Sequence, residues 1–121
     1  MATFQEVIAH IKSNYVAEDM DGGLKLEFNN DGGRTQLVFV FGQPDSPFLV
    51  ISSPFAQNVG ADAVLQIAND SVFGVKKFGD MYTLQHVVPL SDVDASEVEF
   101  GLKMVALAAD ELESKFGGDR F

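Results

Sequence analysis

The fold is decided by residues 94–116, which read DASEVEFGLKMVALAADELESKF. Asp94 has the side chain of a helix N-cap, and Glu97 follows at the spacing of a capping box, so the sequence predicts a helix from Asp94 to Phe116. Its apolar residues recur at alternating steps of four and three, which places them within about 40° of one line: Val98, Leu102, Val105, Ala109, Leu112 and Phe116. Such a helix needs a broad apolar surface beneath it, and we expect the preceding sequence to supply a sheet.

A second apolar row, formed by Phe100, Met104 and Leu107, falls roughly 160 to 240° around the same helix. A contiguous apolar strip on a monomer normally marks a contact surface, so we expect a partner or a second copy to cover this row. The alternative is that the first helix or segment 17–23 folds over it. The remaining arc of the helix is predicted to face solvent, and it holds Glu99, Lys103, Asp110, Glu113 and Ser114.

The sequence before residue 94 predicts two more helices and five strands. Thr3 and Glu6 form another capping box, which opens a helix from Phe4 to Asn14. A short helix is predicted at 58–68, with Val64, Leu65 and Ala68 turned inward, and strands are predicted at 24–29, 34–41, 48–53, 72–78 and 81–88. Residues 17–23 are acidic and end in glycine, so we expect a loop. The predicted fold is α+β: an antiparallel five-stranded sheet with three helices in the order α-β-β-β-α-β-β-α.

The strand at 34–41 is apolar on both faces, with Leu37, Phe39 and Phe41 on one and Val38 and Val40 on the other. This pattern is typical of a central strand that is covered twice. Since three helices cover one sheet face well, we also expect Val38 and Val40, or the opposite row, to contact a partner. The strand at 48–53 is apolar on both faces too, and Pro54 is predicted to end it.

Composition limits the class of protein. The 121 residues fit one domain, residues 1–121, and 18 acidic against 8 basic residues give a net charge of −10. Phosphate binding needs clustered Lys and Arg, so nucleic acid is a poor partner. With no Cys there is no thiolate nucleophile or thiolate metal site. A signal peptide and a membrane span are both missing from the pattern, so we expect a cytoplasmic protein.

Side chains that could carry chemistry are few and scattered. His10 and His86 are the two histidines, and neither has a ligand or a base at motif spacing. Asp110 and Glu113 fall on the predicted solvated arc, which favours a surface role over acid–base work. We therefore expect no catalytic residue, no cofactor and no metal site, and a protein that is not an enzyme.

Three short stretches resemble a known family. They are Val88-Pro89-Leu90-Ser91-Asp92-Val93-Asp94, then Ala109-Asp110-Glu111-Leu112-Glu113, then Gly117-Gly118-Asp119. With the element order, the length and the acidity, they resemble the YbjN family and the class I type III secretion chaperones of the CesT type, which are bacterial. The resemblance implies a secretion chaperone-like fold and a peptide-binding or regulatory domain, usually dimeric, without catalytic residues. A secretion system is not implied.

Two functions follow as hypotheses. The first is a non-enzymatic, chaperone-like or regulatory domain that binds a peptide or protein on an apolar surface, as a homodimer, through Phe100, Met104, Leu107, Val38 and Val40. The alternative is a small-molecule-binding protein or enzyme with a pocket between the sheet and the helices. A deep pocket lined by His86 and carboxylates would favour the alternative, and a shallow groove beside an open strand edge would favour the first.

Overall fold

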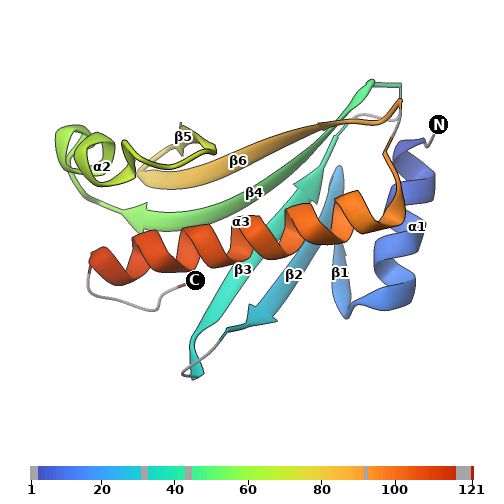
Figure 1. Cartoon of the computed structure of the whole chain (residues 1–121), viewed down its shortest axis with the longest axis horizontal. Coiled ribbons are helices and arrows are strands. Elements are labelled where there is room, and N and C mark those ends of the chain that lie inside the picture. Colours follow the sequence, from blue (N-terminus) through green and yellow to red (C-terminus); the bar gives the residue numbers. More distant parts are fainter. Residues whose placement is uncertain (1–2, 31–32, 43–44, 92, 117–120) are drawn as a thin grey trace.

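The computed structural model describes residues 3–30, 33–42, 45–91, 93–116 and 121. Within these residues the chain is α+β, as predicted, with three helices and one antiparallel sheet of six strands (Figure 1). The elements are α1 (Phe4–Asn14), β1 (Ala17–Met20), β2 (Gly23–Asn29), β3 (Thr35–Phe41), β4 (Phe48–Gln57), α2 (Ala61–Ala68), β5 (Gly74–Phe78), β6 (Met81–Pro89) and α3 (Ala95–Lys115). The strands lie in the order β1-β2-β3-β4-β6-β5.

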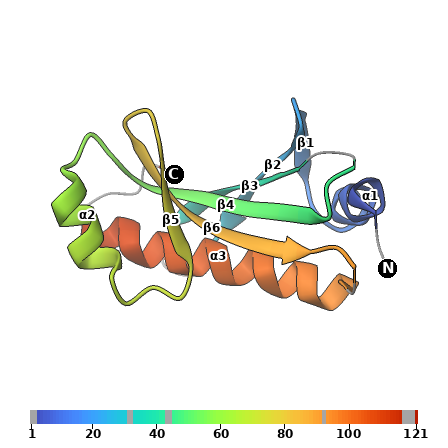
Figure 2. The ribbon, with the colours of Figure 1, turned by 90° about the horizontal axis from the view of Figure 1, so that it is seen from above.

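Helix α3 lies along one face of this sheet, with α1 near one end of it and α2 near the other (Figures 1 and 2). Asp94 is its N-cap, because the carboxylate accepts a hydrogen bond from the Glu97 backbone N–H at 2.9 Å. The predicted core face is confirmed, since Val98, Leu102, Val105, Ala109 and Leu112 are buried. The bounds of α1 and its Thr3–Glu6 capping box are confirmed as well.

The strand count was wrong by one, because residues 17–20 are a strand and not a loop. Strand β1 pairs antiparallel with β2, from Ala17 opposite Leu26 to Met20 opposite Gly23. Its sequence, Ala-Glu-Asp-Met, has no apolar alternation that would indicate a strand. The pairing is instead supported by its neighbours: Lys25 lies 3.6 Å from Glu18, and Lys12 lies 2.9 Å from Asp19.

Strand β3 is central, as predicted, but in the described residues helices cover only one of its faces. Val38 and Val40 are fully buried in the core cluster that includes Leu102 of α3. On the opposite face Leu37, Phe39 and Phe41 are half-buried, and no described helix lies over them (Figure 2). The expectation of a doubly covered strand was therefore wrong, because all three helices pack on the same side.

Two further predictions were wrong in detail. Pro54 does not end β4, which continues to Gln57 by a shift of register between Pro54 and Ala56, so the missing N–H of proline falls at an irregularity. Leu65 points outward from α2, because a helix of eight residues buries only one short row, Val64 and Ala68. Asp92 and the stretch Gly117-Gly118-Asp119, which contribute to the family resemblance, lie outside the described residues.

Candidate functional site

The outer face of α3 carries three exposed apolar side chains in one row. Phe100 is 67% exposed, Met104 37% and Leu107 53%, and we call these three residues the α3 stripe. The competing expectation, that α1 or segment 17–23 covers the row, is wrong. Both segments pack elsewhere, since α1 buries Phe4, Val7 and Ile11 in the core and 17–20 extends the sheet.

A hollow of about 240 Å³ lies beside this stripe, between α3 and the segment that joins α2 to β5. We call it the α3 groove. Its apolar walls are Ile67, Val72, Phe73, Met104, Ala108 and Leu112, and its rim carries Asp70, Glu111 and Lys115. Met104 belongs both to the stripe and to the groove, so the two form one continuous apolar surface.

Glycine at position 101 sets how closely α3 approaches the sheet. A Cβ atom there would lie 3.1 Å from Ile51 Cδ1 and 3.3 Å from the His86 ring, so a larger residue would require these side chains or the helix to shift by a few tenths of an ångström. The ring of His86 also packs against Phe73, with 5.4 Å between centroids. His86 therefore lies beneath the groove wall as a packing residue.

Val38 and Val40, the other two predicted contact residues, are not on the surface of the chain. They are fully buried beneath α3, so a partner of the folded domain cannot reach them. The sequence could not decide this point, because β3 is apolar on both faces. The opposite row is more accessible, and Phe48 and Val87 extend the uncovered face, each about half exposed.

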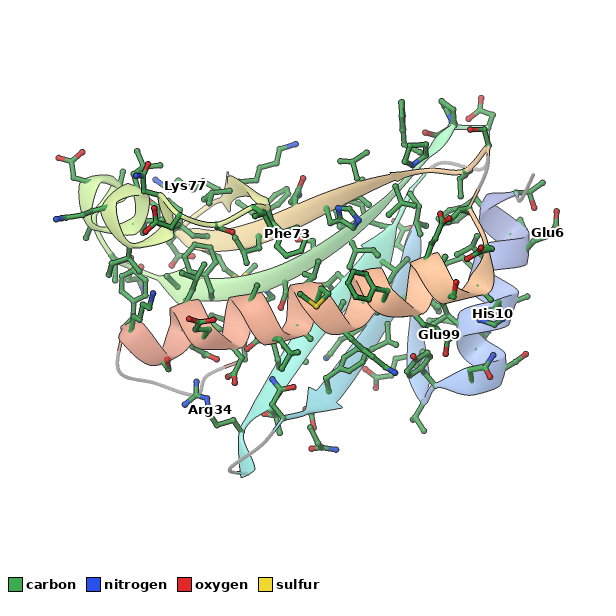
Figure 3. The ribbon with its side chains drawn as sticks, in the orientation of Figure 1. Glu6, His10, Arg34, Phe73, Lys77 and Glu99 are labelled. Atoms are coloured by element: carbon green, nitrogen blue, oxygen red, sulfur yellow. The ribbon has the colours of Figure 1, made fainter. Side chains whose placement is uncertain are left out.

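Asp110 and Glu113 were predicted to face solvent, and this prediction was wrong. They are only 8% and 2% exposed, because Arg34 reaches them from the start of β3 (Figure 3). Arg34 Nε lies 2.7 Å from Asp110 Oδ1, and Arg34 Nη2 lies 3.6 Å from Glu113 Oε1. Glu113 also accepts a hydrogen bond from the Phe121 N–H at 3.0 Å. The sequence held two separate signals of this contact: a single arginine, Arg34, directly before a strand, and an acidic pair at i and i+3 on the last helix.

Another polar cluster joins α1 to α3. His10 Nε2 lies 3.8 Å from Glu99 Oε2, and the Tyr15 hydroxyl donates a hydrogen bond to Glu99 Oε1 at 3.3 Å (Figure 3). Burial, and then the Glu99 carboxylate, raise the pKa of Tyr15 above its usual value. The neighbouring hollow, about 200 Å³, is lined by Val7, Val93, Ala95 and Val98 together with the polar residues Glu6, His10 and Asp94.

Across the ranges that the structure describes, His, Asp and Glu side chains nowhere gather in the groups of three or more that could hold a metal ion. None of the described helices combines the length and the apolarity needed to cross a lipid bilayer.

Comparison of the chain with protein-family models and with curated protein sequences finds no match. The fold is thus shown only as far as α+β with a six-stranded antiparallel sheet.

Proposed function

We propose that this chain is a non-enzymatic domain that binds a peptide or protein segment on the α3 stripe and the α3 groove. The observation that carries the proposal is the exposure of Phe100, Met104 and Leu107 in one row beside an apolar hollow. Large apolar side chains that are contiguous on a surface mark interaction sites, whereas single exposed ones do not.

The chemistry of this surface favours an apolar ligand with a few polar ends. The groove walls are aliphatic and aromatic, and charge is confined to its rim. Aromatic anchors in such a pocket supply most of the binding energy at interfaces. The groove is shallow and lies near an open strand edge, which suits an extended or amphipathic segment.

We also propose that two copies pair through the same stripe as a homodimer when no partner segment is bound, so that the second copy and the segment compete for it. A closed two-fold contact places one patch against its own copy, and it is the commonest way to bury such a strip. The resemblance to YbjN-like proteins and CesT-type chaperones supports the same proposal, and with it a secretion chaperone-like fold and a cytoplasmic location.

Light scattering tests the dimer. Wild type is expected to have twice the mass of one chain at high micromolar concentration, and Phe100→Asp is expected to be a folded monomer. Val16→Asp is the control, because it also replaces an exposed apolar side chain with aspartate, at a residue between α1 and β1. A monomeric wild type would remove the homodimer, while an unfolded Phe100→Asp would place the stripe in the core.

Site-specific photo-crosslinking tests partner binding directly. A photoreactive amino acid at position 107 is expected to capture a defined partner, and the same amino acid at position 16 is expected to capture none. Leu65→Asp on α2 is expected to leave capture at 107 unchanged, whereas Phe100→Asp abolishes it. Equal capture at 107 and 16 would show nonspecific adhesion and would contradict the proposal.

A further inference from the structure

Strand β5 ends the sheet, so within the described residues one side of its backbone has no strand beside it. Its other side pairs with β6, where Lys76 lies opposite Thr83 and Lys77 opposite Tyr82. The Lys76 carbonyl oxygen accepts a hydrogen bond from the Thr83 hydroxyl at 3.3 Å, so the backbone of Lys76 faces β6. Backbone groups alternate along an antiparallel strand, so Val75 and Lys77 direct their N–H and C=O groups to the open side.

This open edge carries positive charge on an acidic protein. Lys76 and Lys77 are consecutive, so they project to opposite faces of the sheet. In the described part of the chain no carboxylate oxygen lies within 4.0 Å of either ammonium, whereas Lys12, Lys25 and Arg34 all pair with acids. The two ammonium groups instead lie 5.9 Å from the Phe78 ring and 5.6 Å from the Tyr82 ring.

We infer that β5 accepts an acidic, extended segment of a partner protein as a seventh strand. Two adjacent acidic residues in that segment would meet one lysine on each face, and Val75 and Lys77 would supply the backbone hydrogen bonds. The inference rests on the proposed protein-binding function and extends its site. Phe73 of the groove wall directly precedes β5, so a segment that leaves this end of the edge would come next to the α3 groove.

Charge also argues against a second copy as the occupant. Pairing β5 with another β5 would bring lysines opposite lysines, which is unfavourable. Lysines on an edge strand prevent such self-pairing, and the same charges select a strand of opposite sign. The acidic edge strand of a second copy, β1, is a poorer match, because Glu18 and Asp19 already contact Lys25 and Lys12.

The test uses the ¹⁵N-labelled full chain and a soluble peptide, TVTDEVTV, at physiological salt. Backbone amides of Val75 and Lys77 are expected to shift and to exchange more slowly. A TVTKKVTV peptide is expected to bind about tenfold more weakly, because both of its charge pairs become repulsive. An acidic peptide N-methylated at the residues that face β5 is expected not to bind, because it has no N–H to donate to the Val75 and Lys77 carbonyls and its methyl groups hinder close approach to the edge.

Single charge reversals then locate the contact. Lys76→Glu and Lys77→Glu are each expected to weaken binding of the acidic peptide about threefold to tenfold. Lys103→Glu, an equal charge change on exposed α3, is expected to alter it less than about twofold, because salt screens distant charges.

Other outcomes would overturn the inference. Equal binding of the N-methylated peptide would mean attraction by charge alone. Shifts confined to the α3 stripe, or no binding of any peptide at millimolar concentration, would remove the β5 site, and crosslinking at position 107 would still decide the proposed function separately. If wild-type chains assemble end to end and the Glu18→Lys variant does not, then the strand that pairs with β5 is β1 of a second copy.

Discussion

The guanidinium of Arg34 contacts two carboxylates of α3, those of Asp110 and Glu113. It thereby links the residue directly before β3 to the C-terminal half of the helix. The helical periodicity of α3 placed Asp110 and Glu113 on one side of the helix, but it could not show which neighbouring residue lies against that side. Burial of a charged residue depends on a partner from elsewhere in the chain, so the sequence placed this pair in water. The exposed stripe followed from the same periodicity, but the sequence left open whether the first helix or segment 17–23 would cover it, and only the structure shows both of them packed elsewhere.

Replacing Arg34 with methionine is expected to destabilise the domain by about 2 to 4 kcal/mol, since two nearly buried carboxylates lose their cation. The lower end of the range reflects the partial exposure of the arginine side chain. Urea unfolding at neutral pH measures the change. Lys103→Met is the control and is expected to stay within about 0.5 kcal/mol. Equal midpoints for wild type and Arg34→Met would show that the ion pairs contribute nothing.

Because of Tyr15, we expect the free energy of unfolding to fall at alkaline pH. Its pKa is raised above its ordinary value of 10.0 in the fold, so folding favours the protonated phenol. This contribution is complete below the pKa of the unfolded chain and disappears as the pH rises through the higher folded value. In a Tyr82→Phe background, Glu99→Gln is expected to lower the Tyr15 pKa, measured by tyrosinate absorbance. Glu27→Gln should leave it unchanged, and an unshifted pKa in Glu99→Gln would show that the carboxylate has no influence.

Among the elements, those with local signals were predicted best. A capping box fixed the start of α1 and an N-cap aspartate that of α3, because both motifs are formed by residues three positions apart. Strand β1 was missed because its stability comes from β2 and from two lysines, and β4 was cut short because its sequence does not reveal the irregularity that accommodates Pro54. The identity of the covered face of β3 depends on where the helices pack, which no local pattern contains.

Two leucines on α3 separate its faces. Leu102→Ala is expected to cost about 2 to 5 kcal/mol, because the side chain is fully buried against the sheet. Leu107→Ala is expected to change the stability of the monomer by less than about 0.5 kcal/mol. Both are measured by urea unfolding in the Phe100→Asp background, which removes the proposed dimer. A large loss for Leu107→Ala would mean that the stripe is packed within the chain.

The whole molecule is a single sheet with helices on one side, which leaves the stripe, the groove and the uncovered face of the sheet for contacts. If the stripe joins two copies, folding and association are linked. The melting temperature of wild type is then expected to rise with protein concentration, and that of Phe100→Asp to stay constant. Val16→Asp should behave like wild type. A melting temperature independent of concentration in wild type would contradict the dimer.

The polar contacts of α3 have a mechanical consequence. Glu99, which binds Tyr15, directly precedes the stripe, and Asp110, which binds Arg34, follows it. The span from Phe100 to Leu107 is thus held in place by polar contacts near both ends, and Gly101 within it packs against the sheet. A partner that docks there meets a surface already held in shape, so little of its binding energy goes into ordering the helix.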